Sequence, residues 1–300
     1  MPGAATPENQ ETAELVAAVA GASCQGAEVY IGYLRGDVDP LTDVLVELGR
    51  RGPMHPTVVV PLIGLSHPGV DAVVNAAIAA SGTVSLKAAP LGPHPLLAEA
   101  LHVRLAEAGL SRATRVGRVN IVTGAEGVIV CAEGGPEAVQ GAGVVAVLLA
   151  SRLTLPVACA PLSEPARIKE SAQEMLAAGV ASVALAPCAI GPELGPGTLE
   201  AVVAQTGLPS AAPMGGHHAI GQLVAIRYGG ALVDPQLAKL ADNSAGPSGS
   251  GTGTRGLPPE ARHTAGQRET PGQARDGDGR GLPNQQPPGG TTRSGLPTRR

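Results

Sequence analysis

The chain has 300 residues, of which 43% are apolar, and a formal net charge of −4. No stretch approaches the roughly 18 consecutive apolar residues of a membrane-spanning helix, and no basic cluster precedes a hydrophobic segment near Met1. With no Phe, no Trp and only three Tyr, the chain also lacks the aromatic surface on which single-stranded nucleic acids stack. We therefore expect a cytoplasmic protein that binds neither membranes nor nucleic acids.

The first half alternates amphipathic stretches with short β-branched runs, a pattern that indicates helices packed on a parallel sheet. In chain order, it predicts a helix from Asn9, a strand at residues 28–34, a helix from Pro40, a strand at 58–62, a helix from His67, a strand at 84–89 and a helix from His94.

The second half shows the same alternation. It predicts a strand at residues 128–132, a helix from Pro136, a strand at 157–160, a helix from Glu164, a strand at 183–187, a helix from Leu194, a strand at 210–213 and a helix from His217. Four strand–helix pairs of this kind make one doubly wound α/β domain.

Residues 244–300 differ in composition from the rest of the chain. They are rich in Gly, Pro, Ser, Thr, Arg and Gln, and hold eight Arg against four acidic residues. Such a segment cannot bury enough apolar surface to order itself. We therefore predict an N-terminal domain at 1–110, a C-terminal domain at 121–241 and a disordered tail at 242–300. An alternative is that the tail recruits a partner.

A short segment occurs twice. Residues 88–94 read AAPLGPH and residues 211–217 read AAPMGGH, with the second copy 123 positions after the first. An arginine stands ten positions after each histidine, at Arg104 and Arg227. This is the signature of a duplicated structural unit.

The repeat also shows that the first unit begins late. Matching the strand at 58–61 with that at 183–187 places the counterpart of strand 128–132 near residue 3. Residues 1–7 contain two prolines and a glycine, which argues against a strand. Either the first domain lacks its opening strand, or the natural start lies upstream of Met1. A truncated sheet would leave an unpaired strand edge that a second subunit could cover.

Side chains that follow the carboxyl ends of parallel strands are the first candidates for a site. His67 follows the strand at 58–62, with Asp71 one helical turn later. An imidazole there can act as a base or a metal ligand, although it can also simply begin the helix while Asp71 is solvated. His94 and His217 occupy the same position of the repeat. They are either pocket residues or histidines that form hydrogen bonds within their own turn.

Other motif classes are missing from the sequence. There is no phosphate-binding P-loop, no GxSxG nucleophile elbow and no HExxH zinc pair. The four cysteines are Cys24, Cys131, Cys159 and Cys188, widely separated and without CxxC spacing. They are typical of reduced thiols packed in a core.

Together these residues resemble a known family. The run VVVPL at 58–62 leads to His67 and Asp71, PLGPHPLLAEAL spans 90–101, and PMGGH at 213–217 leads through a helix to Arg227 and Tyr228. They resemble the sirohydrochlorin chelatases, the cobalto- and ferrochelatases of the type II group, in the long form with two fused halves. The resemblance covers about residues 9–235.

The resemblance implies insertion of Co²⁺ or Fe²⁺ into sirohydrochlorin, a tetrapyrrole, without an organic cofactor. The pocket would lie between the halves, with His67 as the metal-handling base and Asp71, His94 and His217 as further pocket candidates. Family members carry a second histidine in a His-Gly-Ser motif that closes the opening strand, and residues 1–7 contain no such motif. The alternative is a chelatase-like protein that binds metal or tetrapyrrole without turnover.

Overall fold

The computed structural model describes residues 1–24, 26–51, 57–111 and 124–233. All of these residues belong to a single unit. The predicted tail and most of the segment that joins the two predicted domains fall outside the described residues. Among the residues described, no helix is both long and apolar enough to cross a membrane.

The first half contains four helices and a two-stranded sheet among its described residues. The elements are α1 (Pro7–Ser23), α2 (Leu41–Arg50), β1 (Thr57–Val59), α3 (Pro68–Ser81), β2 (Ser85–Lys87) and α4 (Pro95–Glu107). β1 and β2 pair in parallel, with Val58 opposite Leu86. Three of the helices begin with Pro in their first turn, because proline lacks the N–H that would be unpaired there.

The second half contains a three-stranded parallel sheet. Its described elements are β3 (Gly127–Ala132), α5 (Pro136–Leu153), β4 (Val157–Pro161), α6 (Pro165–Ala177), β5 (Val183–Pro187), α7 (Thr198–Thr206) and α8 (His218–Leu232). The strand order is β4-β3-β5. β3 is buried at every position, because helices cover both faces of the sheet: Val130 packs in the core with Leu97 of α4, and Ile129 with Ile168 of α6. The predicted α/β fold with parallel sheets is confirmed.

The strand predicted at residues 28–34 is wrong. In this described stretch only Tyr33 makes an isolated bridge, to Pro40. In the second half, the strand at the corresponding place, β4, pairs with the opening strand β3. The sheet described in the first half consists of β1 and β2 alone. A strand at 28–34 therefore has no central neighbour to complete its ladder.

Met1 forms backbone hydrogen bonds with the segment at residues 28–34. Its amino group donates to the Gly32 carbonyl at 2.8 Å, and its carbonyl accepts from the Leu34 N–H at 3.0 Å. Only one residue of residues 1–7 lies along the segment in this way. The predicted absence of an opening strand agrees with these contacts.

The strand predicted at 210–213 is also wrong, since it is reduced to a bridge between Leu185 and Ser210. Leu185 donates to the Pro209 carbonyl at 2.8 Å and accepts from the Ala211 N–H at 3.0 Å. Pro213 has no N–H with which to extend the ladder. The pairing with β5 therefore ends after a single residue.

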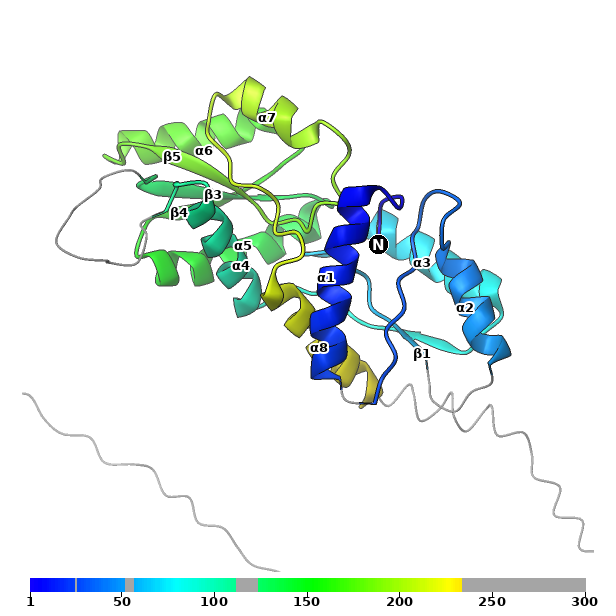
Figure 1. Cartoon of the computed structure of the whole chain (residues 1–300). Helices are drawn as coiled ribbons and strands as arrows, with labels where there is room; N and C mark the ends of the chain where they lie inside the picture. The colour runs from blue at the N-terminus through cyan, green and yellow to red at the C-terminus, as the bar shows by residue number, and fades with distance from the viewer. Residues whose placement is uncertain (25, 52–56, 112–123, 234–300) are drawn as a thin grey trace, which may run out of the picture. The chain divides into compact units, whose positions relative to one another are not determined.

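The last helix of each half packs against the other half. α4 contacts α5 and β5 of the second half, while α8 contacts α1 and β1 of the first. Figure 1 shows α1 and α8 side by side. The two halves therefore share a hydrophobic cluster, in which Val16 of α1 and Leu101 of α4 pack together with Val130 and Leu223.

The repeated arginines hold this exchange in place. Arg104 on α4 donates from Nε and Nη2 to the Met214 carbonyl at 3.1 and 2.9 Å. Arg227 on α8 donates from Nη2 to the Leu91 carbonyl at 2.7 Å. Met214 and Leu91 are equivalent positions of the repeat, each three residues before the histidine. An arginine of each half therefore donates to the carbonyl at the equivalent repeat position of the other half.

Replacing Arg227 by methionine should lower the free energy of unfolding by about 1–3 kcal/mol, because the buried Leu91 carbonyl would lose its donor. Urea unfolding followed by circular dichroism measures the change. Arg50→Met is a matched control, since Arg50 is exposed in a surface ion pair with Glu47 and should contribute less than about 1 kcal/mol. Equal losses in the two variants would show that the exchange does not depend on this arginine.

Candidate functional site

His67 lies at the start of α3, after a seven-residue link, residues 60–66, that follows the end of β1. It is the N-cap of the helix, and its Nδ1 accepts a hydrogen bond from the Val70 N–H at 3.2 Å. Pro68 occupies the first helical position. The alternative that His67 begins a helix is therefore correct, but it does not exclude a chemical role, since its Nε2 is not used by this bond.

The capping bond determines which nitrogen of neutral His67 carries the proton. Nδ1 can accept only through its lone pair, so the proton of the neutral ring lies on Nε2. Binding a metal at Nε2 would move that proton to Nδ1, and the capping bond would be lost. Because an N-cap is worth about 1 kcal/mol, the chemistry of His67 is coupled to the first turn of α3.

His67 lines a cavity of about 260 Å³ to which both halves contribute. Arg35, His67 and Val73 come from the first half, and Pro192, Glu193 and Leu194 come from the loop after β5. His67, Arg35 and Glu193 are thus the charged or titratable residues among the largely apolar residues that line this cavity. The sequence resemblance had implied a pocket between the halves.

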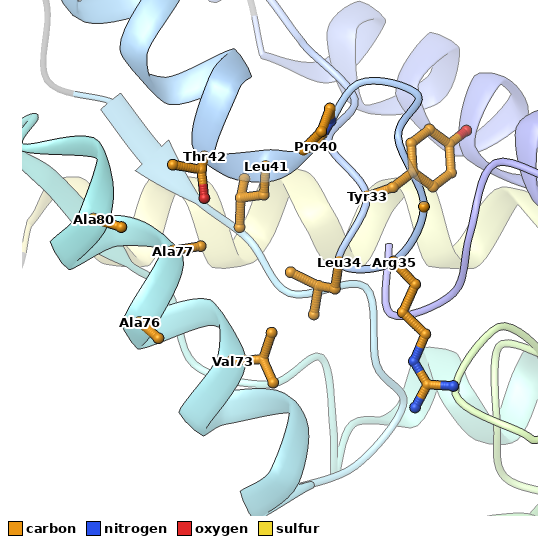
Figure 2. Close-up of a pocket in the computed structure, with 11 residues that line it drawn as sticks. Tyr33, Leu34, Arg35, Pro40, Leu41, Thr42, Val73, Ala76, Ala77 and Ala80 are labelled. Carbon is orange, nitrogen blue, oxygen red and sulfur yellow. The ribbon is translucent and has the colours of Figure 1, made fainter.

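A second cavity, of about 340 Å³, adjoins the first and shares Leu34, Arg35 and Val73 with it. Figure 2 shows Val73, Ala76, Ala77 and Ala80 of α3 along one wall and Leu34 and Leu41 opposite. The Arg35 side chain extends away from the row of alanines. An apolar space therefore lies beside the polar one, with Arg35 common to both.

Glu193 is a site residue that was missed in the sequence. Its half-buried carboxylate accepts from the Ile190 N–H at 2.6 Å, the Gly191 N–H at 2.9 Å and the Gly64 N–H at 3.4 Å. Burial raises the pKa of Glu193, although these backbone donors oppose the shift. The internal repeat could have identified it. Glu193 lies six residues after Pro187, just as His67 lies six residues after Pro61.

Asp71 does not join His67 in either cavity. Its Oδ1 accepts from Lys87 Nζ at 2.6 Å, in a half-buried ion pair that links α3 to β2. This contact gives Asp71 a structural task. Its predicted place in a substrate pocket stays a prediction.

His94 and His217 each cap the helix that they precede. Nδ1 of His94 accepts from the Leu96 N–H, and Nδ1 of His217 from the Ala219 N–H, both at 3.2 Å. Neither residue lines the two cavities described above. The repeated histidine therefore bonds its own turn, as one of the two sequence interpretations proposed.

These two caps should make stability depend on pH. Burial, and then the nearby guanidinium groups, lower the pKa of His94 and His217. The folded state then binds fewer protons than the unfolded state, whose histidine pKa is about 6.5. Stability from this source is complete above about pH 6.5 and decreases as the pH falls through that value, since a protonated Nδ1 cannot accept.

Urea unfolding at about pH 7.5 and pH 5 tests this dependence. The double variant His94→Asn/His217→Asn keeps both caps, because asparagine is a favoured N-cap residue, but it has no imidazole to titrate. Its stability should decrease less on acidification than that of the wild type, by about 1 kcal/mol per cap. Parallel pH curves for the two proteins would contradict the prediction.

All four cysteines are free thiols. Cys131 and Cys188 are buried in the core, and burial raises the pKa of Cys131 to about 12. Such thiols are inert at neutral pH. Cys131 and Cys188 are therefore packed in the interior as predicted, whereas Cys24 and Cys159 are half-buried.

No protein-family model and no curated protein sequence matches the chain. The structure, however, aligns with the crystal structure of sirohydrochlorin chelatase SirB from Bacillus subtilis subspecies spizizenii in complex with cobalt. The TM-score is 0.56 at 15% identity, over 78% of this chain and 94% of that chain. The chain has the sirohydrochlorin chelatase fold. SirB from Bacillus subtilis with Fe³⁺ aligns with a TM-score of 0.55 at 16% identity, over 82% of this chain and 94% of that chain.

The chelatase fold is confirmed, and it brings together only part of the predicted site. His67 lies in the cavity between the two halves of this fold. Among the described residues, no group of three or more His, Cys, Asp or Glu side chains is placed to hold a metal ion.

Proposed function

We propose that the chain is a sirohydrochlorin chelatase-like lyase that inserts Co²⁺ or Fe²⁺ into sirohydrochlorin in the cytoplasm. The observation that carries the proposal is the position of His67, an imidazole at the carboxyl end of the first sheet that lines a cavity formed by both halves. The chelatase fold supports it. The divalent metal is a substrate here, and no organic cofactor is required.

The reaction has two parts that His67 can serve. Two pyrrole N–H protons leave the tetrapyrrole, and the divalent ion takes their place on the ring nitrogens. A neutral imidazole can accept a proton or bind a first-row divalent ion through the nitrogen that has a lone pair. Because Nε2 carries the proton while Nδ1 caps α3, either step at His67 breaks the capping bond with the Val70 N–H. Because metal binding at Nε2 costs the α3 cap, His67 would hold the ion less tightly by about 1 kcal/mol, or roughly fivefold. A weakly held ion is easier to pass to the macrocycle.

The two cavities suit different parts of the same substrate. The alanine-lined wall of α3 offers an apolar surface to the macrocycle. Arg35, at the junction of the two cavities, offers a guanidinium to the carboxylate side chains of the tetrapyrrole, a pairing that is planar and bidentate. Substrate binding would thus combine apolar burial with recognition of charge.

The proposal is tested by mixing the purified full chain with sirohydrochlorin and Co²⁺ or Fe²⁺ under anaerobic conditions and following the visible spectrum. The expected result is metallation faster than in a protein-free control. A rate equal to that control with both ions would overturn the proposed activity.

A second candidate function is binding of tetrapyrrole or metal without turnover. Of the predicted site residues, His67 lines the cavity, whereas Asp71 pairs with Lys87 and the two repeated histidines cap their own helices. Few of the predicted groups are then placed to move protons, which favours this candidate. Absorbance titration with metal-free sirohydrochlorin separates the two. Saturable binding together with a metallation rate equal to the protein-free control would support the binding protein.

A further inference from the structure

We infer that Glu193 is a positioning residue through which the second half of the chain sets the position of His67. The inference rests on the proposed function only for its catalytic consequence, because the placement of an imidazole can be measured without turnover. Glu193 touches the same cavity as His67, but its carboxylate is directed to backbone N–H groups.

The internal repeat places Glu193 and His67 at equivalent positions of the two halves. Pro61 follows β1 and Pro187 ends β5, and the sixth residue after each proline is His67 or Glu193. Both side chains accept from backbone N–H groups near their own position, His67 from Val70 and Glu193 from Ile190 and Gly191. The duplicated position therefore became an imidazole in one half and a carboxyl group in the other.

The carboxyl group also reaches across to the first half. It accepts from the Gly64 N–H at 3.4 Å, and Gly64 lies in the link that leads to His67. The Gly64 carbonyl accepts from the Gly92 N–H at 2.8 Å. The N–H and the carbonyl of Gly64 are thus both hydrogen-bonded, and the acceptor for its N–H is Glu193.

Close packing leaves the link little freedom to move. A Cβ added to Gly64 would lie 2.9 Å from the Cys188 carbonyl oxygen, and one added to Gly134 would lie 2.5 Å from the Ser66 carbonyl oxygen. Ser66 Oγ also donates to Glu137 at 2.9 Å. The second half therefore contacts the link at Gly64 and at Ser66, on the residues that immediately precede His67.

Loss of the carboxylate should disturb the link because buried N–H donors would be left without acceptors. Glu193→Gln keeps the size of the side chain but replaces one acceptor oxygen by an NH₂ group, which repels either the Gly191 N–H or the N–H groups of Ile190 and Gly64. Glu193→Asp keeps the charge but shortens the side chain by one methylene, so that it cannot reach both its own loop and Gly64. The two variants weaken the contact by different routes.

The test is nuclear magnetic resonance of the imidazole signals in the full chain, with the His67 signal assigned by its loss in His67→Asn. The expected result is that both Glu193 variants shift the His67 signal while leaving that of His102 on α4 in place. Val202→Ala is the matched control, since Val202 is buried on α7 in the second half and its truncation lowers stability without touching the link. It should leave the His67 signal unchanged.

A purely structural Glu193 would give the opposite result, in which the Glu193 variants and Val202→Ala lower the unfolding temperature and none shifts the His67 signal. That outcome would overturn the inference. If the wild-type chain metallates sirohydrochlorin, Glu193→Gln should also lower kcat by about tenfold or more with KM little changed, because misplacement of a catalytic group acts on the chemical step. A wild-type chain without activity would overturn the proposed function, but the imidazole shift would still decide the positioning role.

Discussion

Replacing His67 by asparagine should lower kcat/KM for metal insertion by about a hundredfold or more, while the chain stays as stable as the wild type. The loss is expected because a positioned acid–base group contributes typically 10²–10⁴-fold. Stability should be retained because an asparagine side chain can accept the Val70 N–H bond that His67 Nδ1 accepts now, and asparagine is among the favoured N-cap residues. The anaerobic metallation assay and urea unfolding measure the two properties.

His67→Ala is the matched control for this variant. It removes both the imidazole and the cap, so it should lose the same activity and in addition about 1 kcal/mol of the free energy of unfolding. The pair separates chemistry from folding at one position. Wild-type rates in His67→Asn would show that the imidazole is not the base, whatever the stability of the variant.

Replacing Gly134 by alanine should lower the free energy of unfolding by about 2–6 kcal/mol. Gly134 has φ +121°, and a Cβ there would lie 2.5 Å from the Ser66 carbonyl oxygen and 3.3 Å from His67 Cα. Backbone strain of this kind costs about 1–3 kcal/mol, and overpacking adds typically 1–3 kcal/mol. Urea unfolding followed by circular dichroism measures the total.

Gly135→Ala isolates the strain from the contact. Gly135 also has a positive φ, +96°, but no heavy atom lies within 4 Å of an added Cβ. It should therefore cost only the strain, about 1–3 kcal/mol. If the two variants lose equal stability, the approach of Gly134 to the link before His67 has no energetic importance.

Much of the fold was predictable because its signals are local. Pro68 and Pro95, each after a histidine that can accept a backbone bond, determine where α3 and α4 begin, and these starts were predicted correctly. The buried run at β3 was equally clear, because a strand covered on both faces is apolar throughout. The strand predicted at 28–34 failed because a strand forms only beside a partner, and its own composition does not reveal whether one exists.

The candidate site was predictable only in part, for the same reason. His67 was found because a residue after a strand end needs no knowledge of the other half. Glu193 was missed because an isolated glutamate in a Gly- and Pro-rich loop looks like a solvated residue, and burial by another half of the chain is invisible in the local pattern. The ion pair of Asp71 with Lys87 was likewise not foreseen, since it joins α3 to a strand that follows it.

The sequence by itself determined the duplication, the helix starts and the α/β class, since each depends on residue types within a few positions of one another. Only the tertiary structure decided what the repeated residues do. Arg104 and Arg227 appeared in the sequence as marks of a repeat, and their roles emerged once each was seen to bond a carbonyl of the opposite half. Glu193 and His67 line one cavity for the same reason, because that cavity forms only when the two halves have folded against each other.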